Sequence, residues 1–184
     1  MKRRKFLAGG LAAMGGAALF KDLFAQRPGP AAPDAASVKT AIEQSKGPAP
    51  KVDKLTLKPE EWRTRLTPAQ FDVLRKEGTE RPWTSPFNNE KRKGMFHCAG
   101  CDHVLFSSEM KYESSTGWPS FFTTMPGAFE KSTDFKMIYP RTEYHCAKCG
   151  GHHGHVFNDG PSPTGQRWCN NGVALRFIPK AGKA

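Results

Sequence analysis

The sequence predicts a mainly β domain preceded by short helices. Its 184 residues are enough for one ordinary domain. After residue 93, the chain consists of short runs rich in β-branched and aromatic residues, separated by Gly, Pro and Asp. A clear helix signal stands only before these runs, and the one internal repetition is a doubled Cys-x-x-Cys. These observations indicate one sheet-based domain in the C-terminal two thirds of the chain.

Residues 1–25 have the features of an export signal. A basic start, Lys2 to Lys5, is followed by an apolar run from Phe6 to Phe20 that is too short to span a bilayer well. The run Arg3-Arg4-Lys5-Phe6-Leu7 is similar to the twin-arginine motif. We therefore expect a twin-arginine-type signal peptide, export to the periplasm, and no stable membrane insertion after cleavage. The alternatives are an uncleaved anchor and a basic amphipathic start.

Residues 26–54 are rich in Pro and Ala and predict a flexible tether. Such a composition buries too little apolar surface to offset the entropy lost on ordering. A short helix over Val38–Gln44 is possible, but it would be marginal in isolation. The folded domain is therefore expected over residues 55–180.

The elements of this domain are predicted in order along the chain. Thr67 is a helix cap, Pro68 fits the first turn, Phe71 and Leu74 lie three residues apart, and Gly78 ends the helix. The strand-like runs that follow are Gly94–Cys98, His103–Ser107, Phe135–Tyr139, Thr142–Cys146, His155–Phe157 and Gly172–Ile178.

The net charge of +11 is a weak functional signal. Residues 1–25 contain five basic residues and one acidic residue, so +7 remains if they are removed. This excess favours anionic surfaces. The sequence has no dense stripe of arginine and aromatic residues, so we expect a basic soluble protein that binds no nucleic acid.

Four cysteines form two pairs with metal-knuckle spacing. Each Cys-x-x-Cys presents two thiolates from one tight turn, and two such turns make a closed tetrahedral site. The pairs are separated by 44 residues, which places them on different hairpins. Disulfides and a redox Cys-x-x-Cys are the alternatives, but a thioredoxin-like motif would need a βαβ setting that the sequence lacks. We expect one structural Zn²⁺ held by Cys98, Cys101, Cys146 and Cys149.

The fifth cysteine, Cys169, is a candidate reactive thiol. If its segment is extended, Arg167, Cys169 and Asn171 share one face, which continues as Val173, Leu175 and Phe177. The positive charge of Arg167 would then favour the thiolate, the form that attacks. A bulge at Gly172 would break this register. The alternative is a buried cysteine that serves as a small apolar residue.

Two histidines and a tryptophan complete the set of candidate site residues. His152 and His155 lie among glycines, which disfavour a helix, and near a thiol they could donate protons at neutral pH. Turn chemistry is the alternative, and a metal site of His152, His155 and Cys169 is a weaker one. Trp118 is held extended before Pro119 and could wall an apolar pocket, although plain core packing explains it equally well.

Taken together, these segments resemble the methionine-R-sulfoxide reductase family from about Leu66 to Pro179. The shared motifs are Gly78-Thr79-Glu80-Arg81-Pro82, both Cys-x-x-Cys pairs, Gly117-Trp118-Pro119-Ser120-Phe121, His152-x-Gly154-His155-Val156-Phe157 and Arg167-x-Cys169-x-Asn171. The resemblance implies two antiparallel sheets with short N-terminal helices and a structural zinc away from the active site. It also implies an enzyme that reduces methionine-R-sulfoxide, free or in proteins.

The resemblance assigns a role to each candidate residue. Cys169 matches the nucleophile that attacks the sulfoxide sulfur and becomes a sulfenic acid. His152, His155 and Asn171 match residues that bind and protonate the sulfoxide oxygen. Arg167 matches the support of the thiolate, and Trp118 the wall that receives the methyl group.

Three positions depart from the family pattern. Thr116 stands where many members carry a recycling cysteine, so we expect an external thiol to reduce the sulfenic acid. Trp168 replaces the usual Tyr, and Gly172 the usual Ser. Rival interpretations are a non-catalytic zinc-ribbon-like binding module and a zinc hydrolase, which needs an open metal position. We expect a monomer.

Overall fold

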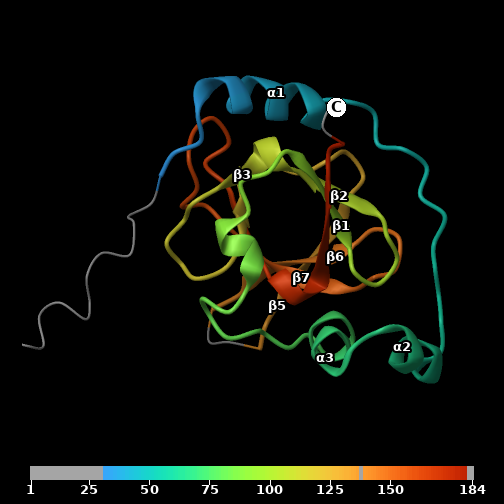
Figure 1. Ribbon diagram of the computed structural model, residues 1–184. Helices are drawn as coiled ribbons and strands as arrows, with labels where there is room; N and C mark the ends of the chain where they lie inside the picture. The colour runs from blue at the N-terminus through green and yellow to red at the C-terminus, as the bar shows by residue number, and fades with distance from the viewer. Residues whose placement is uncertain (1–30, 137–138, 182–184) are drawn as a thin grey trace, which may run out of the picture.

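Two antiparallel sheets form the body of the molecule (Figure 1). The computed structural model describes residues 31–136 and 139–181. The three-stranded sheet has the order β2 (Val104–Ser107), β1 (Gly94–Cys98) and β9 (Leu175–Pro179). The six-stranded sheet has the order β3 (Lys111–Tyr112), β4 (Ser120–Phe121), β8 (Arg167–Asn170), β7 (His152–Phe157), β6 (Arg141–Cys146) and β5 (Phe129–Asp134). The mainly β fold with two antiparallel sheets and short N-terminal helices is confirmed.

Helix α3 (Pro68–Lys76) follows the sequence signals closely, and α2 (Pro59–Arg65) precedes it. The Thr67 hydroxyl accepts a hydrogen bond from the Gln70 amide, which satisfies one of the free donors of the first turn. The helix ends just before Gly78, because Glu77 adopts the left-handed conformation with φ 58°. Short 3₁₀ turns occur at η1 (Pro86–Asn89), η2 (Ser108–Met110) and η3 (Gly172–Ala174).

Helix α1 (Ala35–Ser45) includes the possible short helix over Val38–Gln44 and lies in the segment expected to be a flexible tether. It lies on the opposite side of the sheets from α2 and α3 (Figure 1), and Ala41 is completely buried. The Ser37 hydroxyl donates to a Glu109 carboxylate at 2.6 Å, and the Ser107 hydroxyl donates to the Gln44 side chain at 2.6 Å. These tertiary contacts stabilise a helix that would be marginal alone. The expected signal peptide over residues 1–25 lies outside the described residues.

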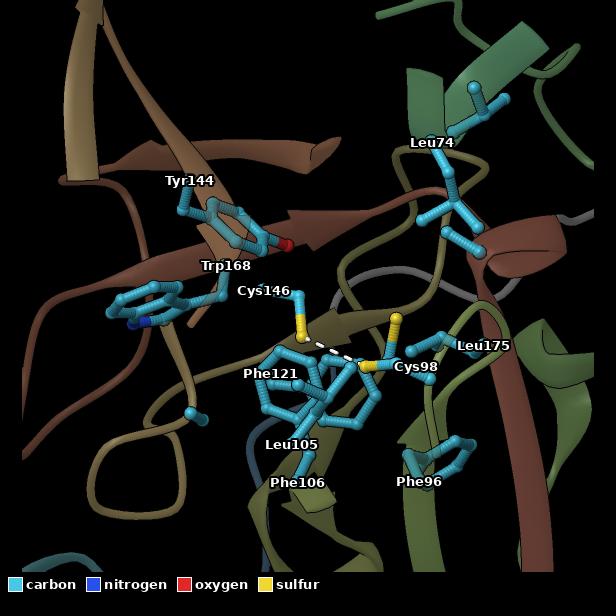
Figure 2. Close-up of a cluster of buried hydrophobic side chains, with 14 of the residues drawn as sticks. Leu74, Phe96, Cys98, Leu105, Phe106, Phe121, Tyr144, Cys146, Trp168 and Leu175 are labelled. Atoms are coloured by element: carbon cyan, nitrogen blue, oxygen red, sulfur yellow. Dashed lines mark hydrogen bonds between the residues drawn. The ribbon is translucent and has the colours of Figure 1, made fainter. Parts of the chain in front are cut away.

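The core between the two sheets is dominated by aromatic side chains. Phe106 stacks on Phe121 with ring centroids 3.8 Å apart, and Phe96 meets Phe121 edge-on at 5.1 Å (Figure 2). Tyr144 and Trp168 pack edge to face on the six-stranded side at 4.9 Å. Each large apolar side chain that is fully buried stabilises the fold by roughly 1.5–3 kcal/mol. The core therefore holds the two sheets rigidly against one another.

Two predicted strands are wrong in position. The described residues of the segment Phe135–Tyr139 are not in a strand, because β5 ends at Asp134, which already pairs with Arg141 at the start of β6. Phe135 and Tyr139 are 76% and 78% exposed, so they have no sheet or core to cover. The run Gly172–Ile178 begins with the turn η3 and only then enters β9.

No helix in the part of the chain that the structure describes is both long enough and apolar enough to cross a membrane.

Candidate active site

Cys169 lies in the middle of the six-stranded sheet. It is on β8, where its cross-strand partners are Ser120 on β4 and His155 on β7. The sheet register therefore brings together residues that are up to 49 positions apart in sequence. A hollow of about 140 Å³ opens beside the thiol, lined by Thr79, Trp118, Arg141, His155, Phe157, Cys169, Asn170 and Asn171. This volume suits a small group such as the end of one side chain.

Burial and charge act in opposite directions on the Cys169 thiol. Burial raises its pKa above the ordinary value of 9.0, because the thiolate loses contact with water. The positive charge of Arg167 and hydrogen bonds from Thr116 and Arg167 lower the pKa in part. Arg167 thus acts in the direction that the sequence predicts, while burial is the larger effect. The net effect in the free protein favours the protonated thiol over the thiolate.

The guanidinium of Arg167 is fixed by a carboxylate and an aromatic ring. Its Nε and Nη2 donate to the two carboxylate oxygens of Asp159 at 2.8 and 2.9 Å. It also lies over the Phe157 ring, 4.3 Å from the centroid. This geometry keeps a permanent positive charge next to Cys169.

We expect Arg167→Met to make the Cys169 thiolate harder to form. The lost positive charge raises the thiol pKa further, so we expect the alkylation rate at pH 8 to fall by roughly tenfold. The measurement is the pH dependence of iodoacetamide labelling of the Cys169 peptide by mass spectrometry. Arg167→Lys is the matched control, because it keeps the charge and should shift the midpoint less. An unchanged midpoint in Arg167→Met would contradict the assigned role.

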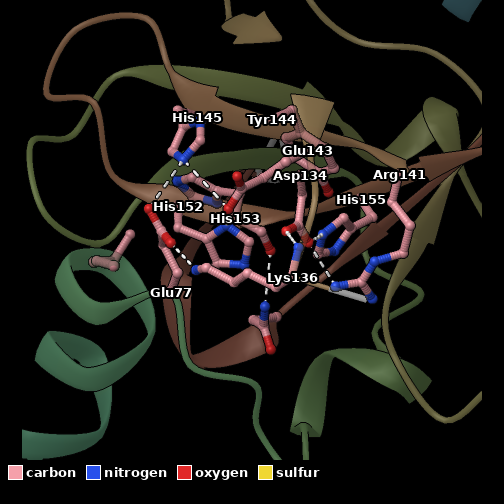
Figure 3. A network of polar contacts seen from close by, with 12 residues as sticks. Glu77, Asp134, Lys136, Arg141, Glu143, Tyr144, His145, His152, His153 and His155 are labelled. Carbon is pink, nitrogen blue, oxygen red and sulfur yellow. Dashed lines mark hydrogen bonds and ion pairs between the residues drawn. The ribbon is translucent and has the colours of Figure 1, made fainter. Parts of the chain in front are cut away.

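His155 is held by an ionised carboxylate (Figure 3). Its Nε2 lies 2.9 Å from Oδ2 of Asp134, which also pairs with Arg141 at 2.6 Å. The backbone amide of Lys136, then His155 and Arg141, hold the pKa of Asp134 well below its usual range. Because ionised Asp134 only accepts hydrogen bonds, His155 donates from Nε2 and keeps Nδ1 available for proton transfer.

His152 lies behind His155 and does not line the hollow. It is 2% exposed, and the two imidazole rings meet edge to face with centroids 5.6 Å apart. Burial, together with the neighbouring histidines, lowers its pKa to about 3. His152 is therefore neutral at physiological pH and adjoins the hollow only through His155.

Asn171 and Trp118 are both fixed by Glu80. The side-chain Oδ1 of Asn171 accepts from the Glu80 backbone amide at 2.9 Å, and the Trp118 indole donates to the Glu80 backbone carbonyl at 3.1 Å. The Glu80 carboxylate accepts from the amides of Gly172 and Val173, which stops β8 and starts the turn η3. This turn ends the polar face at Asn171, so the predicted continuation through Val173 is wrong.

Gly154 permits the close approach of β7 to β8 behind the thiol. Its φ is 155°, and a Cβ added there would lie 2.0 Å from the carbonyl oxygen of Cys169. Gly154→Ala must therefore displace the strand that carries the thiol. We expect the free energy of unfolding to fall by about 3 kcal/mol, the upper end for overpacking, as measured by urea denaturation.

Gly165→Ala is the matched control for this substitution. Its φ is also positive, at 67°, but no atom lies within 4 Å of the added Cβ. We expect it to cost about 1 kcal/mol, from backbone strain alone. Equal losses for the two variants would contradict the steric argument.

The four paired cysteines form a buried cluster at the ends of strands from both sheets. Cys98 ends β1 and Cys146 ends β6, and Figure 2 shows their sulfurs beside the aromatic core. The Sγ atoms of Cys98 and Cys149 are 3.7 Å apart, and those of Cys101 and Cys146 are 3.5 Å apart. A tetrahedral zinc with bonds of about 2.3 Å sets sulfurs about 3.8 Å apart, whereas a disulfide requires about 2.05 Å. The cluster fits a metal ion and excludes disulfide pairing in this state.

Backbone hydrogen bonds shape both knuckles. The Asp102 amide donates to the Cys98 carbonyl, and the Gly150 amide donates to the Cys146 carbonyl at 2.8 Å. The Arg75 guanidinium on α3 donates to the carbonyls of Cys149 and Gly150. Helix α3 therefore braces the second knuckle.

Comparison with known proteins agrees with this geometry. A model of the SelR domain matches residues 66–179. A peptide methionine sulfoxide reductase MsrB of Agrobacterium fabrum is 48% identical over 71% of this chain and 96% of its own length. The chain belongs to the methionine-R-sulfoxide reductase family. Other relatives are an MsrB of Pseudomonas putida (50% identical; 72% of this chain, 98% of its own) and the mitochondrial methionine-R-sulfoxide reductase B2 of Rattus norvegicus (48%; 68% and 77%).

The departures from the methionine-R-sulfoxide reductase pattern have local explanations. Thr116 interacts with the Cys169 thiol, and its hydroxyl lies 2.9 Å from that of Ser114. A Cβ at position 172 would lie 1.9 Å from the Ser85 hydroxyl, so only glycine fits beside Ser85. Trp168 packs in the core and donates to the Gln166 side chain at 3.1 Å.

Several acidic residues near the thiol could not be recognised as site residues from the sequence alone. Asp134, Glu143 and Asp159 are acidic residues without a motif, and only the sheet register brings the first two to the histidines. Glu80 belongs to a motif that supported the resemblance, but its bridging of two segments required the structure.

Proposed function

We propose that this protein reduces methionine-R-sulfoxide to methionine with Cys169 as the nucleophile. The observation that carries the proposal is a small hollow whose lining brings together the Cys169 thiol, the Trp118 indole and the His155 imidazole. Membership in the methionine-R-sulfoxide reductase family supports it. The substrate is methionine sulfoxide, free or in proteins. No observation favours the non-catalytic zinc-ribbon-like binding module.

The reaction transfers one oxygen atom from the sulfoxide to the cysteine. The Cys169 thiolate attacks the sulfoxide sulfur while the oxygen is protonated, and the oxygen then passes to Cys169 as the thioether leaves. The products are methionine and a Cys169 sulfenic acid. Two external thiols then reduce the sulfenic acid, which releases water and one disulfide and restores the Cys169 thiol.

The surrounding side chains have separate parts in this reaction. Trp118 receives the methyl group, and Arg167 stabilises the thiolate. His155 and Asn171 line the hollow, and Asn171 helps to bind the oxygen. His155 takes up the proton of the Cys169 thiol at Nδ1 and passes it to the sulfoxide oxygen. His152 contributes from behind, by fixing the ring of His155.

The reductant is an external thiol, because no other cysteine of the chain is available. Thr116 occupies the place from which a recycling cysteine would act. We expect Thr116→Cys to form a disulfide with Cys169 after one turnover, because the Thr116 side chain already interacts with the thiol. The measurement is peptide mapping of the oxidised variant by mass spectrometry. Thr116→Ser, which keeps the hydroxyl, should show a sulfenic acid and no such disulfide. A Cys169 disulfide with a paired cysteine in the unmodified protein would contradict the proposal.

The metal of the four-cysteine cluster is one structural Zn²⁺. Zinc supplies tetrahedral bonds to four thiolates, and this set leaves no open position for a hydrolytic reaction. Cys98 and Cys146 tie the two sheets together, and Arg75 fixes the knuckle of Cys149. We also propose that the protein is a monomer exported to the periplasm by a twin-arginine-type signal over residues 1–25, with zinc inserted before export. The basic start and the short apolar run support this route.

An assay with the two sulfoxide epimers tests the reductase proposal. The purified full-length protein is given either epimer with dithiothreitol, and methionine is measured together with the oxidation state of Cys169. We expect turnover of the R epimer alone and a sulfenic acid at Cys169 when no thiol is added. Folded, zinc-loaded protein that reduces neither epimer would remove the catalytic proposal and favour the binding module.

A further inference from the structure

We propose that Glu143, His145 and His152 form a second zinc site beside the reductase centre, separate from the four cysteines. The four-cysteine cluster is closed, so a further metal ion needs other ligands. Two imidazoles and a carboxylate make a donor set that zinc commonly uses. The consequence for catalysis rests on the proposed function, whereas the binding of zinc does not.

Sheet geometry gathers these three side chains on one face. Glu143 and His145 are two residues apart on β6, so their side chains point the same way. His152 is the cross-strand partner of His145, next to an irregularity in the β6–β7 register. One ligand atom from each of the three residues lies within 4.8 Å of the other two, as required around a single ion.

The Nδ1 nitrogen of His152, which lies beside Glu143, has no hydrogen-bond partner. His152 is 2% exposed, and its Nδ1 is buried without a hydrogen-bond partner. The nearest carboxylate oxygen, Oε1 of Glu143, is 2.5 Å away but does not meet the angle of a hydrogen bond. A buried polar atom without a partner is costly and needs an explanation. A metal ion bound by both Nδ1 and the carboxylate would satisfy both atoms, with the two moving apart to the roughly 3.3 Å that two tetrahedral zinc bonds require.

A fourth ligand and an entry path lie at the end of α3. Oε1 of Glu77 is 4.0 Å from Nε2 of His145, and the same nitrogen is 3.4 Å from Oε1 of Glu143 (Figure 3). Glu77 is more exposed than the buried pair and forms an ion pair with Lys136. An incoming cation would displace the Lys136 ammonium, bind first to Glu77 and then move to the more buried ligands.

The position of this site links it to the thiol. The ring of His152 is in contact with that of His155, the cross-strand partner of Cys169. Zinc bound at Nδ1 of His152 would hold that ring in place and put a positive charge beside His155. A His152 ring fixed by zinc restricts the movement of the His155 ring against it, so we expect zinc loading to slow sulfoxide reduction.

Zinc stoichiometry tests the site directly. The full-length protein, first brought to one zinc per chain, is dialysed against micromolar ZnCl₂, and bound metal is measured by mass spectrometry. We expect two zinc ions per chain in the unmodified protein and one in His145→Asn. His97→Asn is the matched control, because His97 contacts Asp102 far from this cluster, and it should keep two. A stoichiometry that stays at one in the unmodified protein would overturn the proposal.

Two further variants separate this site from its neighbours. Cys169→Ser should still bind two zinc ions, because the thiol is not a ligand, and loss of the second ion would assign the site to Cys169 instead. Glu77→Gln should keep the fold and weaken the second zinc by at least tenfold. If His145→Asn fails to fold, it will also lose the zinc of the four-cysteine cluster. The zinc stoichiometry of Glu77→Gln then tests the second site.

The effect on catalysis is measured in a single turnover without added thiol, because dithiothreitol chelates zinc. We expect added ZnCl₂ to lower the rate of methionine formation from the R epimer in the unmodified protein and not in His145→Asn. Equal inhibition of both would overturn the proposed link to the reductase centre. If neither reduces the sulfoxide, the reductase proposal fails while the stoichiometry still decides the zinc site.

Discussion

Replacing Cys169 with serine is expected to abolish reduction of methionine-R-sulfoxide. A serine hydroxyl is a far weaker nucleophile than a thiolate, and it has no sulfenic acid state through which the oxygen can leave. We expect the rate of methionine formation to fall by more than about 1000-fold. The measurement is turnover of the R epimer with dithiothreitol in excess. Fold and metal content should be unchanged, because the thiol contacts the hollow and not the cysteine cluster.

A matched control distinguishes loss of the nucleophile from local damage. Ser120→Ala lies directly opposite Cys169 on β4 and removes a hydroxyl from the same neighbourhood. Its hydroxyl bonds to that of Ser114 and to the Trp118 carbonyl, so the substitution perturbs packing without touching the reacting sulfur. We expect it to retain turnover within about tenfold. Residual turnover above a few per cent in Cys169→Ser would mean that another group carries the reaction.

The sequence predicts those parts of the site that depend on residues close together in the chain. Two Cys-x-x-Cys pairs predict a four-cysteine cluster without any knowledge of the fold, because each pair fixes its own two thiols in one turn. The odd cysteine, the glycine-flanked histidines and the tryptophan before proline are likewise local signals. The structure places Cys169, His155, Asn171 and Trp118 around one hollow. Their catalytic roles, and the export signal, stay predictions.

The remaining parts depend on which strands pair. Asp134 reaches His155 only because β5 and β7 flank β6, and Glu143 meets His152 through the β6–β7 register. Glu80 bonds to Trp118, 38 positions away in the chain, and to Asn171, 91 positions away. Neither residue propensity nor periodicity predicts contacts between such distant residues. These acidic side chains were therefore not assigned to the site from the sequence alone.

Helix α1 shows the same limit for local structure. Its composition predicts too little burial to hold a helix, and that reasoning is sound for the isolated segment. In the structure, Ala41 is fully buried and Gln44 bonds to Ser107, so packing decides the outcome. The strand predicted over Phe135–Tyr139 fails for the opposite reason, because aromatic residues there have no partner strand.

Removal of metal from the cysteine cluster is expected to cause the largest loss of stability. Cys98 is at the end of a strand of the three-stranded sheet and Cys146 at the end of a strand of the six-stranded sheet, so a metal ion held by both would join the two sheets. Four buried thiols without a metal lose their ligand bonds and pack poorly against Leu74 and the aromatic core. Structural zinc contributes apparent binding free energies of about 10–16 kcal/mol in small domains. The core between the sheets offsets part of this loss, so we expect more than about 5 kcal/mol.

Cys146→Ser tests this expectation against Cys169→Ser, which removes a thiol elsewhere in the same sheet. Zinc content and the midpoint of urea unfolding are measured for both variants and for the unmodified protein. Cys146→Ser should lose its tightly bound zinc and unfold at much lower urea, whereas Cys169→Ser should keep the zinc and unfold within about 1 kcal/mol of the unmodified protein. If Cys146→Ser keeps its midpoint, the two sheets are held by the aromatic core alone and the cluster has no structural role. A large loss would show that the metal connects the sheet carrying the nucleophile to the rest of the fold, and so keeps Trp118 and Cys169 in the lining of one hollow.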